Sequence, residues 1–192
     1  MKLSLIYFFL LITLSCNNYI KINNSSFDNE SYLEFQNKKI LINDSLVIPK
    51  NKTLIISGES EIKFNKTGII INYGTFKIGE NSKLYSHYAI KNDTLINLKS
   101  VDIIGDKNKS FIINNSIINI YNSAVKNLNL SSYNGQSKFK NINFNNSTLK
   151  ITKGSIKTIN CFLTKDSKLK VNQSESAIFN NNYFMKMMRY LL

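Results

Sequence analysis

The sequence VIPKNKTLIISGESEIKF, residues 47–64, decides the fold, and GIIINYGTFKIG, residues 68–79, continues its pattern. Both stretches consist of short apolar blocks that are each interrupted by Gly, Asn, Ser or Lys. Such blocks are too short for helices, which need apolar residues at a sustained 3.6-residue period. They also follow one another too closely for hairpin strands of about 5–6 residues that each have their own turn. The spacing instead indicates a chain that coils and lays each strand beside the strand of the previous coil, as in a parallel β-helix.

Two of the blocks, residues 61–64 and 75–78, alternate strictly between apolar and polar residues. Because successive side chains of a strand point to opposite faces, this alternation predicts outward Lys63 and Lys77. The predicted inward residues are Ile62, Phe64, Phe76 and Ile78. Similar blocks recur up to about residue 179, so we expect one solenoid whose coils stabilise each other only by stacking.

Asn makes up roughly one residue in six, far above its usual share. AT-rich coding would raise this number, but Asn also tolerates the left-handed region and suits bends between short strands. A short motif with Asn at its second or third position and an apolar residue at its end occurs at 127–130, 141–144, 159–162 and 181–184. Its copies are spaced at about the 20 residues of one solenoid coil, so the Asn residues are expected to stack at a bend as an Asn ladder. Chance recurrence in an Asn-rich chain is the alternative. The predicted ladder residues are Asn129, Asn143, Asn160 and Asn182.

The formal net charge is +13, from 25 Lys and Arg against 12 Asp and Glu, and the only Arg is Arg189. Nucleic-acid binders favour Arg and gather their charge on one face, so this composition argues against a nucleic-acid partner. A solvated surface that protects strand edges is the simplest interpretation of scattered Lys. An anionic glycan or another anionic surface partner is the functional alternative.

The N-terminus has the pattern of an export signal over residues 1–15, with Lys2 before an apolar core that is too short to span a membrane. The core ends at Thr13-Leu14-Ser15-Cys16, which resembles the lipobox of bacterial lipoproteins, although Leu14 replaces the usual small residue. The resemblance implies a lipid on Cys16 that binds the protein to a membrane. Cleavage with secretion, or a retained anchor, are the alternatives.

No residue pattern predicts a catalytic site, a metal site or a cofactor. His87 has no second His near it, and the acids at positions 93, 102, 106 and 166 are isolated and suit turns. Residues of adjacent coils can lie side by side, so Asp102 and either Asp93 or Asp106 could still form a pair of acids. Cys161 is expected to be a small buried residue, although a disulfide with Cys16 is also open.

The stretch from Pro49 to Gly58, followed by residues 62–64 and 74–79, resembles the opening coils of bacterial surface right-handed β-helix proteins. Asn51 stands where that family often has Gly. In that family the pattern occurs in non-catalytic modules of exported proteins. The resemblance therefore implies a right-handed parallel β-helix at the bacterial outer membrane or cell surface, or a secreted one.

The sequence thus predicts a signal peptide at residues 1–15 and a lipid-attachment Cys, tether and cap at 16–37. The all-β solenoid is predicted at 38–184, and residues 185–192 form a terminal cap or a truncated end. The expected function is a non-enzymatic, lipid-anchored surface scaffold, adhesion or glycan-binding module that acts through an outer face with Tyr and Lys. A polysaccharide lyase or glycoside hydrolase on the same fold is the alternative.

Overall fold

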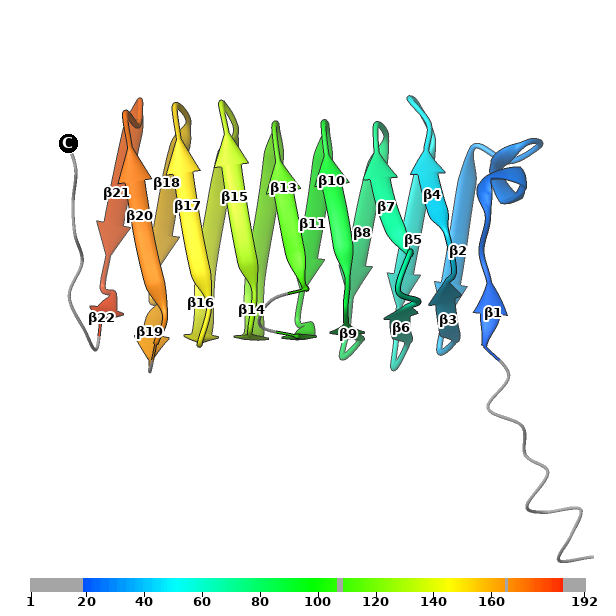
Figure 1. Ribbon diagram of the computed structural model, residues 1–192, viewed down its shortest axis with the longest axis horizontal. Helices are drawn as coiled ribbons and strands as arrows, with labels where there is room; N and C mark the ends of the chain where they lie inside the picture. The colour runs from blue at the N-terminus through cyan, green and yellow to red at the C-terminus, as the bar shows by residue number, and fades with distance from the viewer. Residues whose placement is uncertain (1–18, 107–108, 165, 185–192) are drawn as a thin grey trace, which may run out of the picture.

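The structure is a computed structural model that describes residues 19–106, 109–164 and 166–184. Its short strands stack into one solenoid of about eight turns (Figure 1). Each strand lies parallel to its counterpart in the neighbouring coil, as in the pairs Thr53–Thr75 and Thr148–Lys168. The prediction of an all-β parallel β-helix is confirmed.

The solenoid has three faces, which we name in the order in which the chain crosses them. The first face contains β2 (Tyr32–Gln36), β5 (Thr53–Ser57), β8 (Thr75–Gly79), β11 (Leu95–Lys99), the first halves of β14 (Ile117–Lys126) and β16 (Gln136–Asn145), β18 (Ser155–Ile159) and β21 (Ser176–Asn180). The second face contains β1 (Ile20–Lys21), β3 (Lys39–Ile42), β6 (Glu61–Phe64), β9 (Lys83–Ser86), β12 (Asp102–Gly105), the second halves of β14 and β16, β19 (Phe162–Thr164) and β22 (Tyr183–Phe184). The third face contains β4 (Ser45–Ile48), β7 (Ile69–Asn72), β10 (Ala89–Asn92), β13 (Phe111–Asn114), β15 (Asn129–Tyr133), β17 (Thr148–Thr152) and β20 (Lys168–Asn172).

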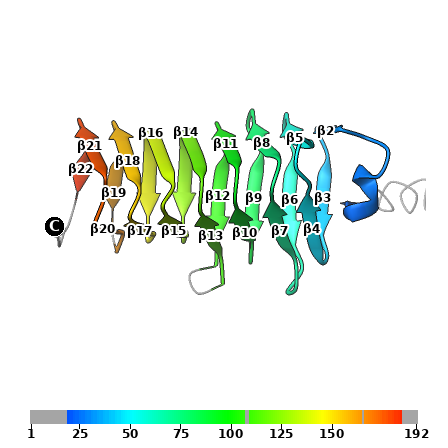
Figure 2. The same ribbon diagram turned by 90° about the horizontal axis from the view of Figure 1, so that it is seen from above.

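The coil is right-handed. In Figure 1 the strands of the third face lie in front and run upward, while those of the first face lie behind and run downward. The chain advances from right to left in this view, and this combination of rotation and advance gives a right-handed coil. The view from above separates the same two faces (Figure 2).

The core consists of inward rows in which each side chain stacks on its counterpart one coil away. One row of the second face runs through Ile40, Ile62 and Leu84, all with no exposed surface. The predicted inward residues Ile62, Phe64, Phe76 and Ile78 are all buried. Lys63 and Lys77 alternate with them and keep solvent contact, as expected for the outward positions of a pleated strand.

The coils turn from the first to the second face at a column of residues with positive φ. Asn occupies this column in most coils, with φ of 54° at Asn37, 49° at Asn122 and 55° at Asn141, and Gly58 occupies it in another with φ of 66°. Gly and Asn adopt the left-handed region at the lowest energetic cost. The abundance of Asn therefore has a structural role at the bends, as the sequence predicted.

A buried Asn ladder crosses the third face. The Asn72 amide donates to Asn92 Oδ1 over 2.7 Å, the Asn92 amide donates to Asn114 Oδ1 over 2.7 Å, and the Asn114 amide donates to Ser132 Oγ over 2.9 Å. The same amides also donate to the main chain beyond the corner, for example from Asn92 to the Ile117 carbonyl. The ladder therefore satisfies polar groups inside the core and fastens the corner between the third and first faces.

The ladder predicted from the sequence was wrong. Asn160 does stack in the bend column, where its amide donates to Asn141 Oδ1 over 3.1 Å. Asn129 lies instead on the third face and Asn143 on the second, while the Asn182 side chain bonds to Thr158 and to the Cys161 N–H. The reason is that coil length varies, as the register pairs Phe111–Asn129 and Ser45–Ile69 show. Residues at the same position of the sequence motif therefore do not lie beside one another in neighbouring coils.

The solenoid also begins earlier than residue 38. β1 pairs with β3, and β2 pairs with β5, so part of the predicted tether and cap already belongs to the coils. The short 3₁₀ turn η1 (Asn24–Phe27) caps the first coil, because Phe27 is buried and Asn24 Oδ1 accepts from the Val47 N–H over 2.7 Å. The predicted signal peptide at 1–15, Cys16 and the predicted cap or truncated end at 185–192 lie outside the described residues.

The buried ladder predicts a large effect of Asn92→Ala. The substitution removes a partner from both Asn72 and Asn114, and buried polar groups without partners cost about 1–3 kcal/mol each. We expect the free energy of unfolding, measured by urea titration, to fall by about 2–3 kcal/mol. Asn143→Ala, at an exposed position, is the matched control and should stay within ~0.5 kcal/mol of wild type. Equal stabilities of the two variants would contradict this role of the ladder.

Candidate ligand-binding surface

The first face carries a stripe of lysines, which we call the first-face stripe. Lys138 and Lys157 stand in one outward row, which starts at Glu34 and also contains Lys77, three coils before Lys138. Lys99, Tyr121 and Lys140 stand in the adjacent outward row, each one coil from the next. The strands of this face contain five lysines and a single acid, Glu34 in β2. The stripe consists of Lys77, Lys99, Tyr121, Lys138, Lys140 and Lys157.

Two lysines of the stripe lie directly opposite each other. Lys138 pairs in register with Lys157, so their strands are about 4.8 Å apart. Like charges at such a position destabilise a sheet. Among the described residues the ion pairs are His87–Asp106, Lys91–Asp93 and Lys109–Asp106, and none of them includes a lysine of the stripe. The apposition therefore concentrates positive charge that an anionic ligand would neutralise.

The second face shows the opposite arrangement. Its first outward row runs Lys39, Glu61, Lys83 and Asp102, so that charges of opposite sign alternate from coil to coil. Opposite charges in register stabilise neighbouring strands. The sequence expectation of dispersed, solvated lysines describes this row, but it does not describe the first face.

A groove runs over the N-terminal part of the stripe. It has a volume of about 610 Å³, and its lining includes Lys77, Lys99, Tyr121, Asn97 and Asn119 as well as two acids, Glu34 and Glu80. Gly79 also lines it, in an outward position where a Cβ atom would make ordinary van der Waals contact with the Lys99 carbonyl oxygen. The Asn119 amide donates to Asn97 Oδ1 over 2.6 Å. Two acids balance the two lysines here, so the amides and the phenol of the groove can bind the hydroxyl groups of a ligand. The excess of positive charge lies farther along the stripe, at Lys138, Lys140 and Lys157.

A hollow of about 500 Å³ at the start of the second face brings acids together. Glu59, Glu61 and Asp102 line it with Lys83. Desolvation by burial, reinforced by a hydrogen bond with Glu61, raises the pKa of the neighbouring Tyr85 to about 12. In the part of the chain that the structure describes, no three His, Cys, Asp or Glu side chains are close enough to hold a metal ion.

Asp102 does not pair with Asp93 or Asp106, because the three acids lie at three different corners of the coil. Asp102 follows the bend from the first to the second face, and Asp93 follows β10 at the corner to the first face. Asp93 forms an ion pair with Lys91 and accepts a hydrogen bond from Asn115. Asp106 follows β12 at the corner to the third face.

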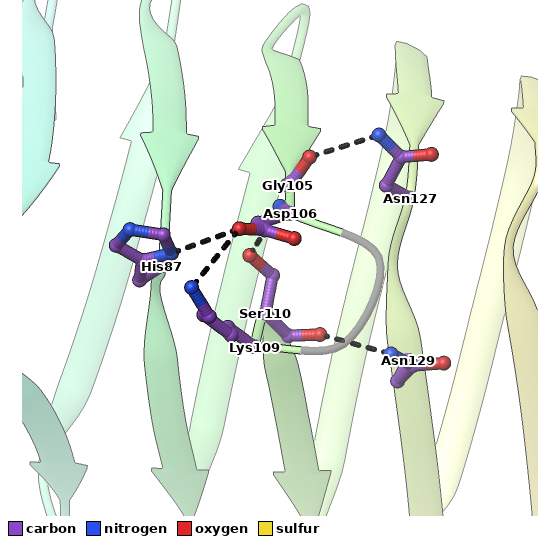
Figure 3. A network of polar contacts seen from close by, with 7 residues as sticks. All are labelled: His87, Gly105, Asp106, Lys109, Ser110, Asn127 and Asn129. Atoms are coloured by element: carbon purple, nitrogen blue, oxygen red, sulfur yellow. Dashed lines mark hydrogen bonds and ion pairs between the residues drawn. The ribbon is translucent and has the colours of Figure 1, made fainter. Parts of the chain in front are cut away.

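His87 and Asp106 meet across two neighbouring coils, a contact that the sequence did not suggest (Figure 3). His87 Nδ1 lies 3.3 Å from Asp106 Oδ2, and Lys109 Nζ lies 3.7 Å from the same oxygen. The Asp106 N–H donates to Ser110 Oγ over 2.7 Å, and Asn127 donates to the Gly105 carbonyl over 3.0 Å. These contacts hold the main chain on either side of a corner loop, which agrees with the predicted turn role of Asp106.

Cys161 is fully buried, as predicted, and burial raises the pKa of its thiol. Its Sγ lies 3.4 Å from the Ile159 carbonyl oxygen. A buried thiol with a raised pKa is a poor nucleophile, so Cys161 serves as a small core residue.

No protein family, curated protein or solved structure matches this chain. Within the described residues, no helix has the length and apolar character needed to cross a membrane. Sequence reasoning missed the stripe because its rows become visible only when the length of each coil is known.

The like-charge pair predicts that Lys157→Glu stabilises the protein. The substitution turns a repulsive pair with Lys138 into an attractive one, and such cross-strand pairs contribute about 0.2–1 kcal/mol. We expect thermal unfolding at low ionic strength to shift upward, and the shift to shrink as salt screens the charges. Lys140→Glu is the control, because it makes the same change of charge at a position whose neighbours in register, Tyr121 and Ile159, are uncharged. A gain of the same size in Lys140→Glu would contradict the pairwise explanation.

Proposed function

We propose that the protein is an exported, non-enzymatic surface scaffold that binds an anionic glycan through the first-face stripe. The observation that carries this proposal is the in-register pair Lys138–Lys157, in a face with five lysines and one acid. A lysine ammonium is a compact point charge that binds carboxylate, sulfate or phosphate groups. The adjacent groove offers amides and Tyr121 for sugar hydroxyls.

The proposal includes a lipid on Cys16, which the lipobox-like sequence supports. Only Asn17, Asn18 and Tyr19 separate Cys16 from the first coil at Ile20. A fully extended residue spans at most about 3.6 Å, so this linker would keep the first coil close to the membrane. The stripe, which is strongest in β16 and β18, would lie several coils farther along the solenoid.

Binding to the stripe is tested with dextran sulfate, using uncharged dextran as the reference polymer. We expect the protein to bind only dextran sulfate, with an affinity that falls as salt rises. The double variant Lys138→Gln/Lys157→Gln should weaken binding by about tenfold, whereas Lys150→Gln/Lys170→Gln removes the same charge from the third face. Absence of binding, or equal losses in the two double variants, would overturn the assignment to the first face.

The lipid is tested by labelling cells with radioactive palmitate. We expect label on the wild-type protein and on Cys161→Ser, and none on Cys16→Ser, because the lipobox-like sequence ends at Cys16. Unlabelled wild-type protein would remove the lipid anchor from the proposal and leave secretion or a retained anchor.

A polysaccharide lyase or glycoside hydrolase is the second candidate, favoured by the hollow that gathers Glu59, Glu61 and Asp102 beside Lys83. Paired carboxylates can act as general acid and base on glycosidic bonds. Incubation with acidic polysaccharides should then release new reducing ends, and Glu61→Gln should abolish this release. No release from any polymer would leave the binding function alone.

A further inference from the structure

The third face divides into an apolar part and a basic part. Its outward side chains in β4, β7 and β13 are mainly apolar, and half of those in β17 and β20 are lysines. The apolar residues, which we call the third-face patch, are Val47, Ile69, Ile71, Phe111 and Ile113. The basic residues, which we call the third-face lysines, are Lys150, Lys168 and Lys170.

The third-face patch keeps apolar side chains in contact with water. Phe111 is 36% exposed, and Val47, Ile69, Ile71 and Ile113 are partly exposed outward side chains in two adjacent rows. In one of these rows Lys91 stands between Ile71 and Ile113. Ala89 stands between Ile69 and Phe111, so its small side chain leaves the larger ones accessible. Exposed apolar side chains gathered in this way on a protein exterior mark an interaction site.

The third-face lysines lie on the same face and have no acid beside them within its strands. Lys150 pairs in register with Lys170, which repeats the like-charge apposition of the first face. The seven strands of this face contain no Asp or Glu, and the one other lysine, Lys91, is 3.9 Å from Asp93 at the corner. Strand β15, with outward Asn129 and Ser131, separates these lysines from the third-face patch. A face that carries both positive charge and apolar surface is complementary to an anionic lipid bilayer.

Tyr73 and Tyr133 lie at the edge of the third face where it meets the first, and they are 38% and 39% exposed. Tyr is enriched where a membrane meets water, because its ring is apolar and its hydroxyl is polar. The two tyrosines therefore make the edge of the third face suited to a membrane surface as well.

We infer that the third face lies on an anionic lipid bilayer, with the third-face patch in the interfacial region and the third-face lysines at the headgroups. In this orientation the first face points away from the lipid, so the first-face stripe stays accessible. The inference needs no lipid on Cys16, because it depends on the third face alone.

Orientation is tested by attaching an environment-sensitive fluorophore to a single introduced cysteine in the full chain with Cys16→Ser. Phe111→Cys places the probe in the patch, and Lys99→Cys places it on the first face as the control. The vesicles contain phosphatidylcholine alone or an equal mixture with phosphatidylglycerol, and both carry a quencher in the acyl chains. We expect quenching of the probe at position 111 with the anionic vesicles, and little quenching at position 99. Equal quenching at both positions, or none at position 111, would overturn the inference.

The lysines are tested by sedimentation with the same vesicles. Each lysine near an anionic surface is worth ~1 kcal/mol, so Lys150→Gln/Lys170→Gln should weaken binding roughly thirtyfold. Lys138→Gln/Lys157→Gln removes equal charge from the first face and should have little effect. Equal losses in the two variants would contradict a specific face, and so would unchanged binding in both.

Sedimentation equilibrium without lipid tests a competing occupant, a second copy of the chain. A dimer that Ile71→Ser/Ile113→Ser dissociates would assign the patch to self-association and overturn the membrane inference. A monomer that loses vesicle binding in the same variant would support it. None of these outcomes depends on dextran sulfate binding, so the two proposals can fail separately.

Discussion

The in-register stacking of parallel coils is the constraint on which the rest of this structure depends. Each inner coil hydrogen-bonds to the coil before it and the coil after it, so that a residue always lies beside its counterpart in another coil. An inward position must therefore be apolar in coil after coil, as in the row through Ile40, Ile62 and Leu84. A polar residue can enter such a row only if its neighbours in register satisfy its hydrogen bonds.

Asn meets this requirement in two ways. At the bends its backbone adopts positive φ, which lets the coil turn within a single residue. In the core, the ladder of Asn72, Asn92, Asn114 and Ser132 replaces apolar residues in a row that has Ile48 before the ladder and Ile151 and Val171 after it. Each amide donates and accepts between coils, so the ladder is satisfied only while the register is kept. If one coil slipped by one residue against the next, several buried amides would lose their partners. The ladder therefore fixes the register between neighbouring coils.

The same stacking converts isolated residues into surface rows, and the three faces use it differently. Alternating charges stabilise the row from Lys39 to Asp102 on the second face. The first and third faces instead bring like charges together at Lys138–Lys157 and Lys150–Lys170. These appositions cost stability, and an anionic ligand would recover it. On our proposals, the three-sided shape separates a face for a glycan from a face for a membrane.

The amino-acid pattern by itself determined the fold class, most of the strands and the inward residues of 61–64 and 75–78, because alternation and block length are local properties. It also indicated the role of Asn at bends, since backbone preference belongs to the residue. The ladder residues, the first coil and the Lys rows were decided only by the tertiary structure. Coil length varies from one coil to the next, so register depends on where each chain segment turns. The pairing of Lys138 with Lys157 and the meeting of His87 with Asp106 exist only once that register is known.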